Sequence, residues 1–292
     1  PKDALISNLI WSPNEKKIAF THTTSNAVEL WVIDVASAQA KRLSNAKLNA
    51  NLDNPFVWFK DSENLLVKVL PKNRPALLDA SKDLPTGAII SNADGSVSQN
   101  RTYPDLLKNR NDEINFENIA SSELHKVHVS GTSTLWKKAD MYAGESFSPD
   151  GKLLMLTTIQ KPFSYIVPIN RFPSKTIITD IAGKPIKTVN EVPLTETMPK
   201  GFSATREGKR NMNWRADKPA SLTYVVALDG GDPAKKVDFR DEVFSWDAPF
   251  DQALKSLIKT VQRFTNIVWG NEKLAVITDS WYDTRNEKTY FF

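Results

Sequence analysis

Hydrophobic and polar positions along the chain repeat one short unit, in which an aromatic residue is followed by a polar turn and then by an alternating apolar strand. The unit is clearest at Trp11-Ser-Pro-Asn-Glu-Lys-Lys-Ile-Ala-Phe20 and returns at Phe147-Ser-Pro-Asp-Gly-Lys-Leu-Leu-Met-Leu156. Ser-Pro favours a turn because proline presets φ at the first central position. Weaker copies start at Trp58, Trp214 and Trp269. Five copies of one unit indicate a repeat protein.

The spacing of the copies indicates the kind of repeat. Trp11 and Trp58 lie 47 residues apart, and Trp214 and Trp269 lie 55 residues apart, close to the roughly 40–50 residues of a four-stranded propeller blade. A β-sandwich also has short alternating strands, but it gives no reason for the aromatic unit to recur. In the first unit we predict strands at Asn8–Trp11, Lys17–His22, Glu29–Asp34 and Ala40–Leu43.

The expected fold is therefore all-β, a partial β-propeller of about five four-stranded blades out of about seven or eight in a complete array. Its recurring aromatic residues are expected to pack between adjacent blades. The predicted blades are residues 5–44, 54–138, 145–189, 211–246 and 265–292. In blade three we predict strands at Leu153–Ile159, Ser164–Asn170, Thr176–Asp180 and Ile186–Val189, and in blade four at Leu222–Leu228, Lys236–Phe239 and Glu242–Trp246.

Two segments depart from the regular strand pattern. Blade two contains an insertion at 71–120, because prolines end its second strand and the next strands come only at Glu123–Val129 and Thr134–Trp136. Within it, the Pro-Asp pair favours a short helix over Tyr103–Arg110. In blade four, residues 253–261 have a weak apolar spacing that fits either a one-turn helix or an outer strand.

Composition narrows the class of protein. The chain has 292 residues, of which 40% are hydrophobic and 25% charged, enough for a large buried core. A net charge of +4 spread along the chain gives no reason to expect nucleic acid as a partner. No apolar run approaches the roughly 20 residues of a membrane helix, so no membrane partner is predicted. The absence of cysteine excludes disulfides and thiolate metal sites.

Glycine and histidine positions exclude several kinds of catalytic and cofactor site. The spacing of the eleven glycines leaves no Gly-x-Ser-x-Gly nucleophile elbow, no Walker A loop and no dinucleotide fingerprint. His125 and His128 face opposite sides of a predicted strand, and His22 follows another strand. We therefore predict no metal site and no cofactor, and we identify no catalytic residue.

A cationic segment is the candidate binding element. Arg206, Arg210 and Arg215 lie on the approach to the first strand of blade four, and in a propeller that strand lines the central channel. Arginine suits an acidic ligand there, so these three residues are the substrate-binding candidates. The alternative is a solvated loop partly neutralised by Glu207 and Asp217.

Several motifs in the chain resemble those of known protein families. The Ser-Pro-Asp-Gly type of blade, with Glu29-Leu-Trp-Val-Ile-Asp34, resembles the propellers of prolyl oligopeptidase-type serine peptidases and of TolB-like proteins. Arg101-Thr-Tyr-Pro-Asp-Leu-Leu-Lys108 and Asn213-Trp-Arg-Ala-Asp-Lys-Pro-Ala-Ser-Leu-Thr-Tyr224, followed by Asp229-Gly-Gly-Asp-Pro233, are similar to the glutamyl endopeptidase branch.

The resemblance implies a larger protein, with an N-terminal propeller and a C-terminal α/β-hydrolase domain whose Ser-Asp-His triad cleaves after glutamate. No triad residue can be carried over to this chain, so the chain is expected to be a non-catalytic domain that gates peptide access. Its implied partners are that hydrolase domain and a peptide substrate, and its implied location is periplasmic or secreted. Two alternatives are a stand-alone TolB-like scaffold that binds proteins and a five-bladed enzyme with its site in the channel.

The end of the chain fits the larger protein. The aromatic run Lys288-Thr-Tyr-Phe-Phe292 reads as the middle of a strand, and a bare apolar strand edge invites aggregation. It either closes the last sheet or continues into a longer chain, and we expect the second.

Overall fold

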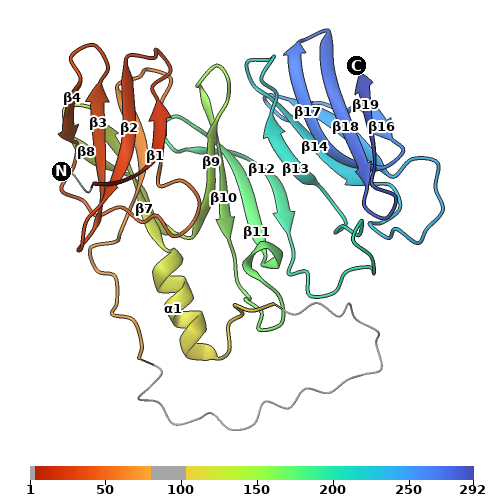
Figure 1. The fold of residues 1–292 in the computed structure, drawn as a ribbon, viewed down its shortest axis with the longest axis horizontal. Coiled ribbons are helices and arrows are strands. Elements are labelled where there is room, and N and C mark those ends of the chain that lie inside the picture. The colour runs from red at the N-terminus through yellow and green to blue at the C-terminus, as the bar shows by residue number, and fades with distance from the viewer. Residues whose placement is uncertain (1–3, 80–102) are drawn as a thin grey trace. The chain divides into compact units, whose positions relative to one another are not determined.

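The computed structural model describes residues 4–79 and 103–292, and five antiparallel sheets follow one another along the chain (Figure 1). The first sheet contains β1 Leu5–Trp11, β2 Lys17–Thr23, β3 Val28–Asp34 and β4 Gln39–Arg42. The second contains β5 Phe56–Trp58, β6 Asn64–Val69, β7 Ser122–His128 and β8 Ser133–Asp140. The third contains β9 Tyr142–Phe147, β10 Leu153–Ile159, β11 Ser174–Asp180 and β12 Pro185–Val192.

The remaining two sheets lie in the C-terminal part of the chain. The fourth contains β13 Arg210–Trp214, β14 Ser221–Ala227, β15 Asp241–Asp247 and β16 Lys255–Thr260. The fifth contains β17 Arg263–Asn271, β18 Leu274–Trp281 and β19 Asn286–Phe291. In every sheet each strand pairs with the next one along the chain, which is the meander of a propeller blade. The predicted all-β propeller fold is confirmed, with three strands rather than four in the fifth sheet.

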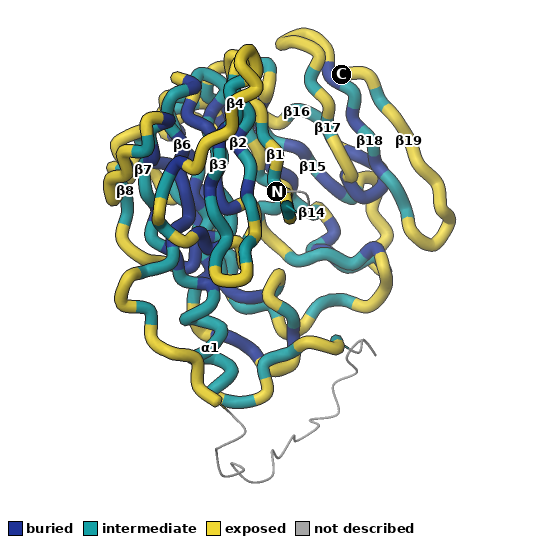
Figure 2. The backbone as a smooth tube through the Cα atoms, turned by 60° about the vertical axis from the view of Figure 1, so that its left-hand side comes forward, coloured by how far each residue is buried: buried dark blue, intermediate teal, exposed yellow. Residues whose placement is uncertain are grey.

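The chain divides into two compact units. The first three sheets, with residues 108–161, belong to one unit, and the fourth and fifth sheets belong to the other. In both, buried residues concentrate in central strands such as β6 and β14, and the turns are exposed (Figure 2).

The insertion in the second sheet contains a helix, α1 Arg110–Ala120, but not the predicted one. Residues 103–109 are not helical, so the prediction over Tyr103–Arg110 is wrong. The start is fixed by Asn109, whose side chain accepts a hydrogen bond from the Asp112 backbone at 2.9 Å, and by Asp112 and Glu113 in the first turn. This N-cap outweighs the Pro-Asp signal. Residues 80–102 of the insertion lie outside the described part of the chain.

Two predicted strands are also wrong. Residues 164–170 form an irregular segment that ends in a 3₁₀ turn, η2 Ile169–Arg171, because prolines at 162, 168 and 173 remove the donors that a ladder needs. Residues 236–239 lie in the loop between β14 and β15. The outer strand of the fourth sheet is β16 instead, which decides the ambiguous spacing over 253–261 in favour of a strand.

The repeated Ser-Pro motifs fold into matching turns. Ser12 Oγ donates to Asn14 Oδ1 at 2.8 Å and accepts from the Lys17 backbone at 3.0 Å. Ser148 Oγ donates to Asp150 Oδ1 at 2.6 Å and accepts from the Leu153 backbone at 3.0 Å. Since serine and its carboxyl or amide partner satisfy the turn backbone locally, similar sequences give the same turn in two blades.

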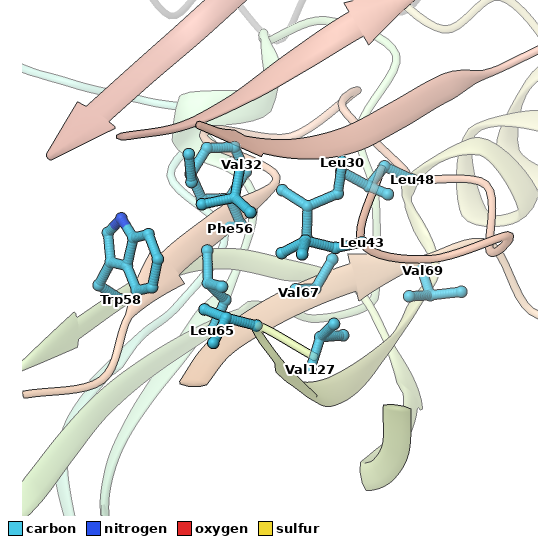
Figure 3. Close-up of a cluster of buried hydrophobic side chains, with 12 residues drawn as sticks. Leu30, Val32, Leu43, Leu48, Phe56, Trp58, Leu65, Val67, Val69 and Val127 are labelled. Atoms are coloured by element: carbon cyan, nitrogen blue, oxygen red, sulfur yellow. The ribbon is translucent and has the colours of Figure 1, made fainter. Parts of the chain in front are cut away.

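The second sheet buries both of its faces. Successive side chains of a strand point to opposite faces, so Leu65, Val67 and Val69 of β6 join a cluster with Leu30 and Val32 of the first sheet (Figure 3). The residue between them, Leu66, instead joins a cluster with Tyr142, Leu154 and Leu156 of the third sheet. A nearly continuous apolar run is the consequence of having a neighbouring sheet on each side.

The recurring aromatic residues do not all pack between sheets as predicted. Trp58 is only 5% exposed in the cluster between the first and second sheets, and its Nε1 donates to the Ile10 carbonyl at 3.1 Å. Phe59 packs against Phe147, with ring centroids 4.7 Å apart. Trp11, at the matching position of the first sheet, is 53% exposed. The prediction is wrong for Trp11, because Ile10, which points to the opposite face of β1, is the residue that packs against this cluster.

One ion pair is buried between the second and third sheets. Lys68 follows Leu66 on the same face of β6 and reaches Glu145 of β9 at 2.9 Å, and both side chains are buried. Lys68 also donates to the Leu52 carbonyl at 2.8 Å. Burial raises the pKa of Glu145 to about 7, although the charge of Lys68 opposes the shift.

Replacing Trp58 by alanine is expected to lower the free energy of unfolding by about 3–5 kcal/mol, since a large aromatic side chain leaves a cavity. The matched variant Trp11→Ala should change it by less than about 1 kcal/mol, as expected for an exposed residue. Urea denaturation followed by circular dichroism measures both. Equal losses in the two variants would contradict the assignment of Trp58 as the buried member of the repeat.

Glu145 should make stability fall as the pH rises. Its folded pKa of about 7 lies above the ordinary value of 4.5, so its contribution is complete below pH 4.5 and is lost as the pH rises through 7. A shift of this size corresponds to about 3 kcal/mol. Denaturation at pH 5 and pH 8 should show this loss in the parent chain, and the double variant Lys68→Met, Glu145→Gln should lose the corresponding part of the slope. An unchanged slope in the double variant would refute the assignment.

Candidate functional site

The three predicted binding arginines do not form one cluster. Arg210 begins β13, and Arg215 follows its last residue, so a whole strand separates them. Arg206 lies in the loop before β13, near enough to Arg210 for that charge to lower its pKa, although burial of Arg206 is the larger cause of the shift. The structure therefore brings Arg206 near Arg210 and places Arg215 elsewhere.

Arg215 is a buried framework residue. It is 4% exposed and donates to both carboxylate oxygens of Asp217, at 3.0 and 2.6 Å. Its Cζ atom lies 3.8 Å from the ring centroid of Trp269 on β17. The hydrogen bonds from Arg215 are the main reason that the pKa of Asp217 is lowered. The Arg215 backbone bonds across the turn to Ser221 as Ser12 does to Lys17, so Arg215 takes the serine position of the repeat and joins the fourth and fifth sheets.

Arg206 is used by its own loop. Its guanidinium donates to the backbone carbonyls of Glu207 and Lys209, and these bonds shape the segment that leads into β13. Arg210 differs, because it also lines a pocket. Of the three predicted candidates, Arg210 is the one that the structure places at a pocket wall.

Behind that wall lies a buried network of arginines and aspartates that the sequence analysis missed. Arg263 donates to Asp229 at 2.7 Å and to Asp241 at 3.0 Å, and Arg240 donates to Asp229 at 2.9 Å. Asp241 also accepts the Phe264 backbone N–H at 2.7 Å and forms an ion pair with Arg210. The network ties the fourth and fifth sheets together, since Asp241 begins β15 and Arg263 begins β17.

The electrostatics of the network favour charged aspartate. Burial by itself would raise the pKa of Asp229, but the hydrogen bonds from Arg240 and Arg263, helped by the charge of Arg263 and the Gly231 backbone, lower it below the ordinary value. Gly231 has a φ of +78°, and an added Cβ would lie 2.0 Å from the Thr205 carbonyl oxygen. The Asp-Gly-Gly-Asp turn therefore requires glycine at this position to hold Asp229 in place.

The pocket in front of the network has a volume of about 450 Å³. Its walls come from the loop over residues 202–205, the first residues of β13 and β17, and the β18–β19 hairpin. The charged residues that line it are Arg210, Arg263, Arg285 and Glu287, and its aromatic residues are Phe202, Trp281 and Tyr282. The sequence did not indicate Arg263 and Arg285, because only the packing of the fifth sheet brings them to the same pocket as Arg210. The one local signal for the buried network was the Asp-Gly-Gly-Asp motif, which contains Asp229.

A second pocket, in the other unit, has a volume of about 640 Å³. Its lining includes a row of three polar residues, Glu123, His125 and Ser133. His125 Nδ1 lies 3.1 Å from Ser133 Oγ, and its Nε2 lies 3.0 Å from a Glu123 oxygen. In α/β-hydrolases the nucleophilic serine sits on a sharp, strained turn between a strand and a helix, whereas Ser133 begins the strand β8. We interpret the row as a cross-strand polar contact.

Within residues 4–79 and 103–292, no three histidine, aspartate or glutamate side chains are grouped so that they could hold a metal ion. No helix in this part of the chain has the length and apolar character needed to cross a membrane.

Comparison with solved structures defines the class of fold. The chain superimposes over its whole length on acylaminoacyl peptidase from Pyrococcus horikoshii, with a TM-score of 0.55 and 11% identity, and it covers 38% of that chain. It also superimposes over its whole length on an oligogalacturonate lyase, with a TM-score of 0.53 and 9% identity, and it covers 68% of that chain. These identities establish the propeller fold alone.

Comparison with the sequences of curated proteins is more specific. No family model matches the chain. Two proteins named "Probable glutamyl endopeptidase, chloroplastic" align with 99% of it: the one from Oryza sativa subsp. japonica is 35% identical and the one from Arabidopsis thaliana 33% identical. The chain covers 32% and 31% of their lengths, about a third. The resemblance to the glutamyl endopeptidase branch is confirmed, and the chain is homologous to part of these peptidases.

Replacing Asp229 by asparagine should lower the free energy of unfolding by about 3 kcal/mol, because it leaves buried arginines without their charge partner. Asp229 has a lowered pKa, so its stabilisation is present above about pH 4 and is lost as the pH falls further. The difference between parent and variant should therefore shrink in acid. Asp238→Asn, an exposed change in the same loop, is the control. Equal stability of both variants at pH 7 would exclude the network as a stabilising element.

Proposed function

We propose that this chain is the non-catalytic β-propeller region of a glutamyl endopeptidase-like serine peptidase, in which it gates peptide access to an α/β-hydrolase domain. The observation that supports this most is the 35% identity that extends over 99% of the chain and over only a third of the relative. Such an alignment corresponds to one region of a larger peptidase. The missing Gly-x-Ser-x-Gly segment agrees with a region that does not supply the nucleophile.

The proposed gating role is supported by the rigidity expected of sheets that pack face to face. Each sheet packs through whole apolar faces against its neighbour in the same unit, and such stacks are rigid because each repeat is held by the next. A rigid wall excludes folded proteins by size and leaves flexible peptides a route. Most residues of the first strand β1 are exposed, and β13 carries exposed side chains at alternate positions, as expected for strands that border solvent. The periplasmic or secreted location stays a prediction.

The test compares the isolated chain with the whole protein encoded by its gene. The isolated chain should give no turnover of glutamate-containing peptides above the uncatalysed rate, with or without a serine-directed inhibitor. The whole protein should cleave those peptides, lose this activity with the inhibitor, and leave the same sequence intact when it lies in a folded domain.

Three outcomes would contradict the proposal or part of it. Turnover by the purified isolated chain would end the non-catalytic assignment. A gene that encodes no hydrolase domain would favour the stand-alone scaffold. Equal cleavage of free peptide and folded domain would remove the gating role while leaving the peptidase assignment intact.

A further inference from the structure

The pocket between the fourth and fifth sheets has the form of a ligand site. Its volume of about 450 Å³ falls within the range of small-molecule sites, roughly 300–1,000 Å³. One wall is aromatic: the rings of Phe202 and Tyr282 stack with centroids 4.2 Å apart, although they come from a loop and a hairpin far apart in sequence. Both side chains are exposed, so this wall can also contact a bound molecule.

The three arginines at the pocket are not equivalent. Arg263 donates to the Ser203 and Arg240 carbonyls and to the two buried aspartates, so its donors are used by the fold. It supplies charge to the pocket, but its hydrogen bonds belong to the framework.

Arg210 is only partly used. Its side chain is 10% exposed, and one terminal nitrogen, Nη2, pairs with Asp241. Its Nε is buried and has no hydrogen-bond partner within the described residues. A buried donor without a partner costs free energy, and this side chain lines the pocket. Arg210 is therefore a positive charge at the pocket wall that Asp241 fixes in position and whose Nε still lacks a hydrogen-bond acceptor.

Arg285 forms a cation–π contact with Tyr282. Its guanidinium lies 3.7 Å over Tyr282, and within the described part of the chain no carboxylate pairs with it. The residue has a φ of +58° in the β18–β19 turn, a conformation that is uncommon outside glycine. Stacking on an aromatic face leaves the edge donors of a guanidinium free, and these match a carboxylate in a bidentate manner.

The charge balance points to an anion. Asp229 and Asp241 lie behind the wall and face three arginines, Arg210, Arg240 and Arg263, so the network keeps one positive charge in excess. Arg285 adds another at the rim, and Glu287 is the single acidic residue in the lining. An anionic group on a ligand would complete this balance.

We propose that this pocket binds a carboxylate carried by a peptide, with Arg210 and Arg285 as its direct partners and the Phe202–Tyr282 wall packing against the adjoining chain. The carboxylate part of the inference rests on the pocket alone, whereas the peptide part rests on the proposed function. Two sources share this chemistry, an acidic side chain and the C-terminal carboxylate.

The experiment measures peptide binding to the chain by isothermal titration calorimetry. One peptide has blocked ends and an internal glutamate, a second has glutamine in its place and a free C-terminus, and a third has glutamine and blocked ends. Binding of either of the first two, but not of the third, supports the proposal and identifies the source. Affinity should fall with added salt.

Variants test the named residues. Arg285→Asn, which tolerates the positive φ, should weaken binding about tenfold or more, as expected for a charge-assisted hydrogen bond. Lys288→Gln makes the same charge change on the same hairpin outside the pocket and should leave binding unchanged. Glu287→Gln should tighten binding about two- to fivefold, with Asp283→Asn as its matched control. Arg210→Gln should also weaken binding, and its fold is checked by circular dichroism.

The proposal is overturned if the carboxylate-free peptide binds as well as the others, if no peptide binds, or if Arg285→Asn and Lys288→Gln weaken binding equally. These outcomes are separate from the failure of the proposed function. Carboxylate binding by a chain whose gene encodes no peptidase would leave the pocket assignment standing, and a working peptidase whose propeller binds no carboxylate would remove it.

Discussion

The structure depends on burying each sheet against a neighbouring sheet of the same unit. Alternation along β6 sends Leu65, Val67 and Val69 toward the first sheet and Leu66 toward the third. Neither face is stable in water alone, because a single sheet has too little apolar contact to offset its ordering entropy. The charge of Lys68 is tolerated on such a face only because β9 supplies Glu145 directly opposite.

The two units meet this constraint in different ways. In the first three sheets, clusters of aliphatic and aromatic side chains fill the space between neighbours. Between the fourth and fifth sheets the apolar cluster is smaller, and ionic contacts share the task, through Arg215 over Trp269 and Arg263 between Asp229 and Asp241. Because ionic contacts are directional, these contacts fix the orientation of the fifth sheet on the fourth in addition to burying their facing surfaces.

Local signals in the sequence predicted what local physics controls. The Ser-Pro turns and the β2, β3, β10 and β14 strands were predictable, since each depends on residues close in the chain. The start of α1 depended on the Asn109 cap, which competed with an equally plausible Pro-Asp signal. Arg206, Arg210 and Arg215 look alike in sequence, and only the packing of the fifth sheet gives them different roles. Arg285 could not be found, because its neighbours come from three separate segments.

The same junction explains why a binding site would form there. Two buried aspartates balance the charges of two arginines, and Arg240 and Arg263 already bond to one oxygen of Asp229 and one oxygen of Asp241. Arg210 is left with one ion pair and a buried Nε without a partner. An additional aspartate at this junction would neutralise its excess positive charge. A chain that keeps the extra arginine retains a cost in stability, which is the pattern expected where a charged ligand completes the network.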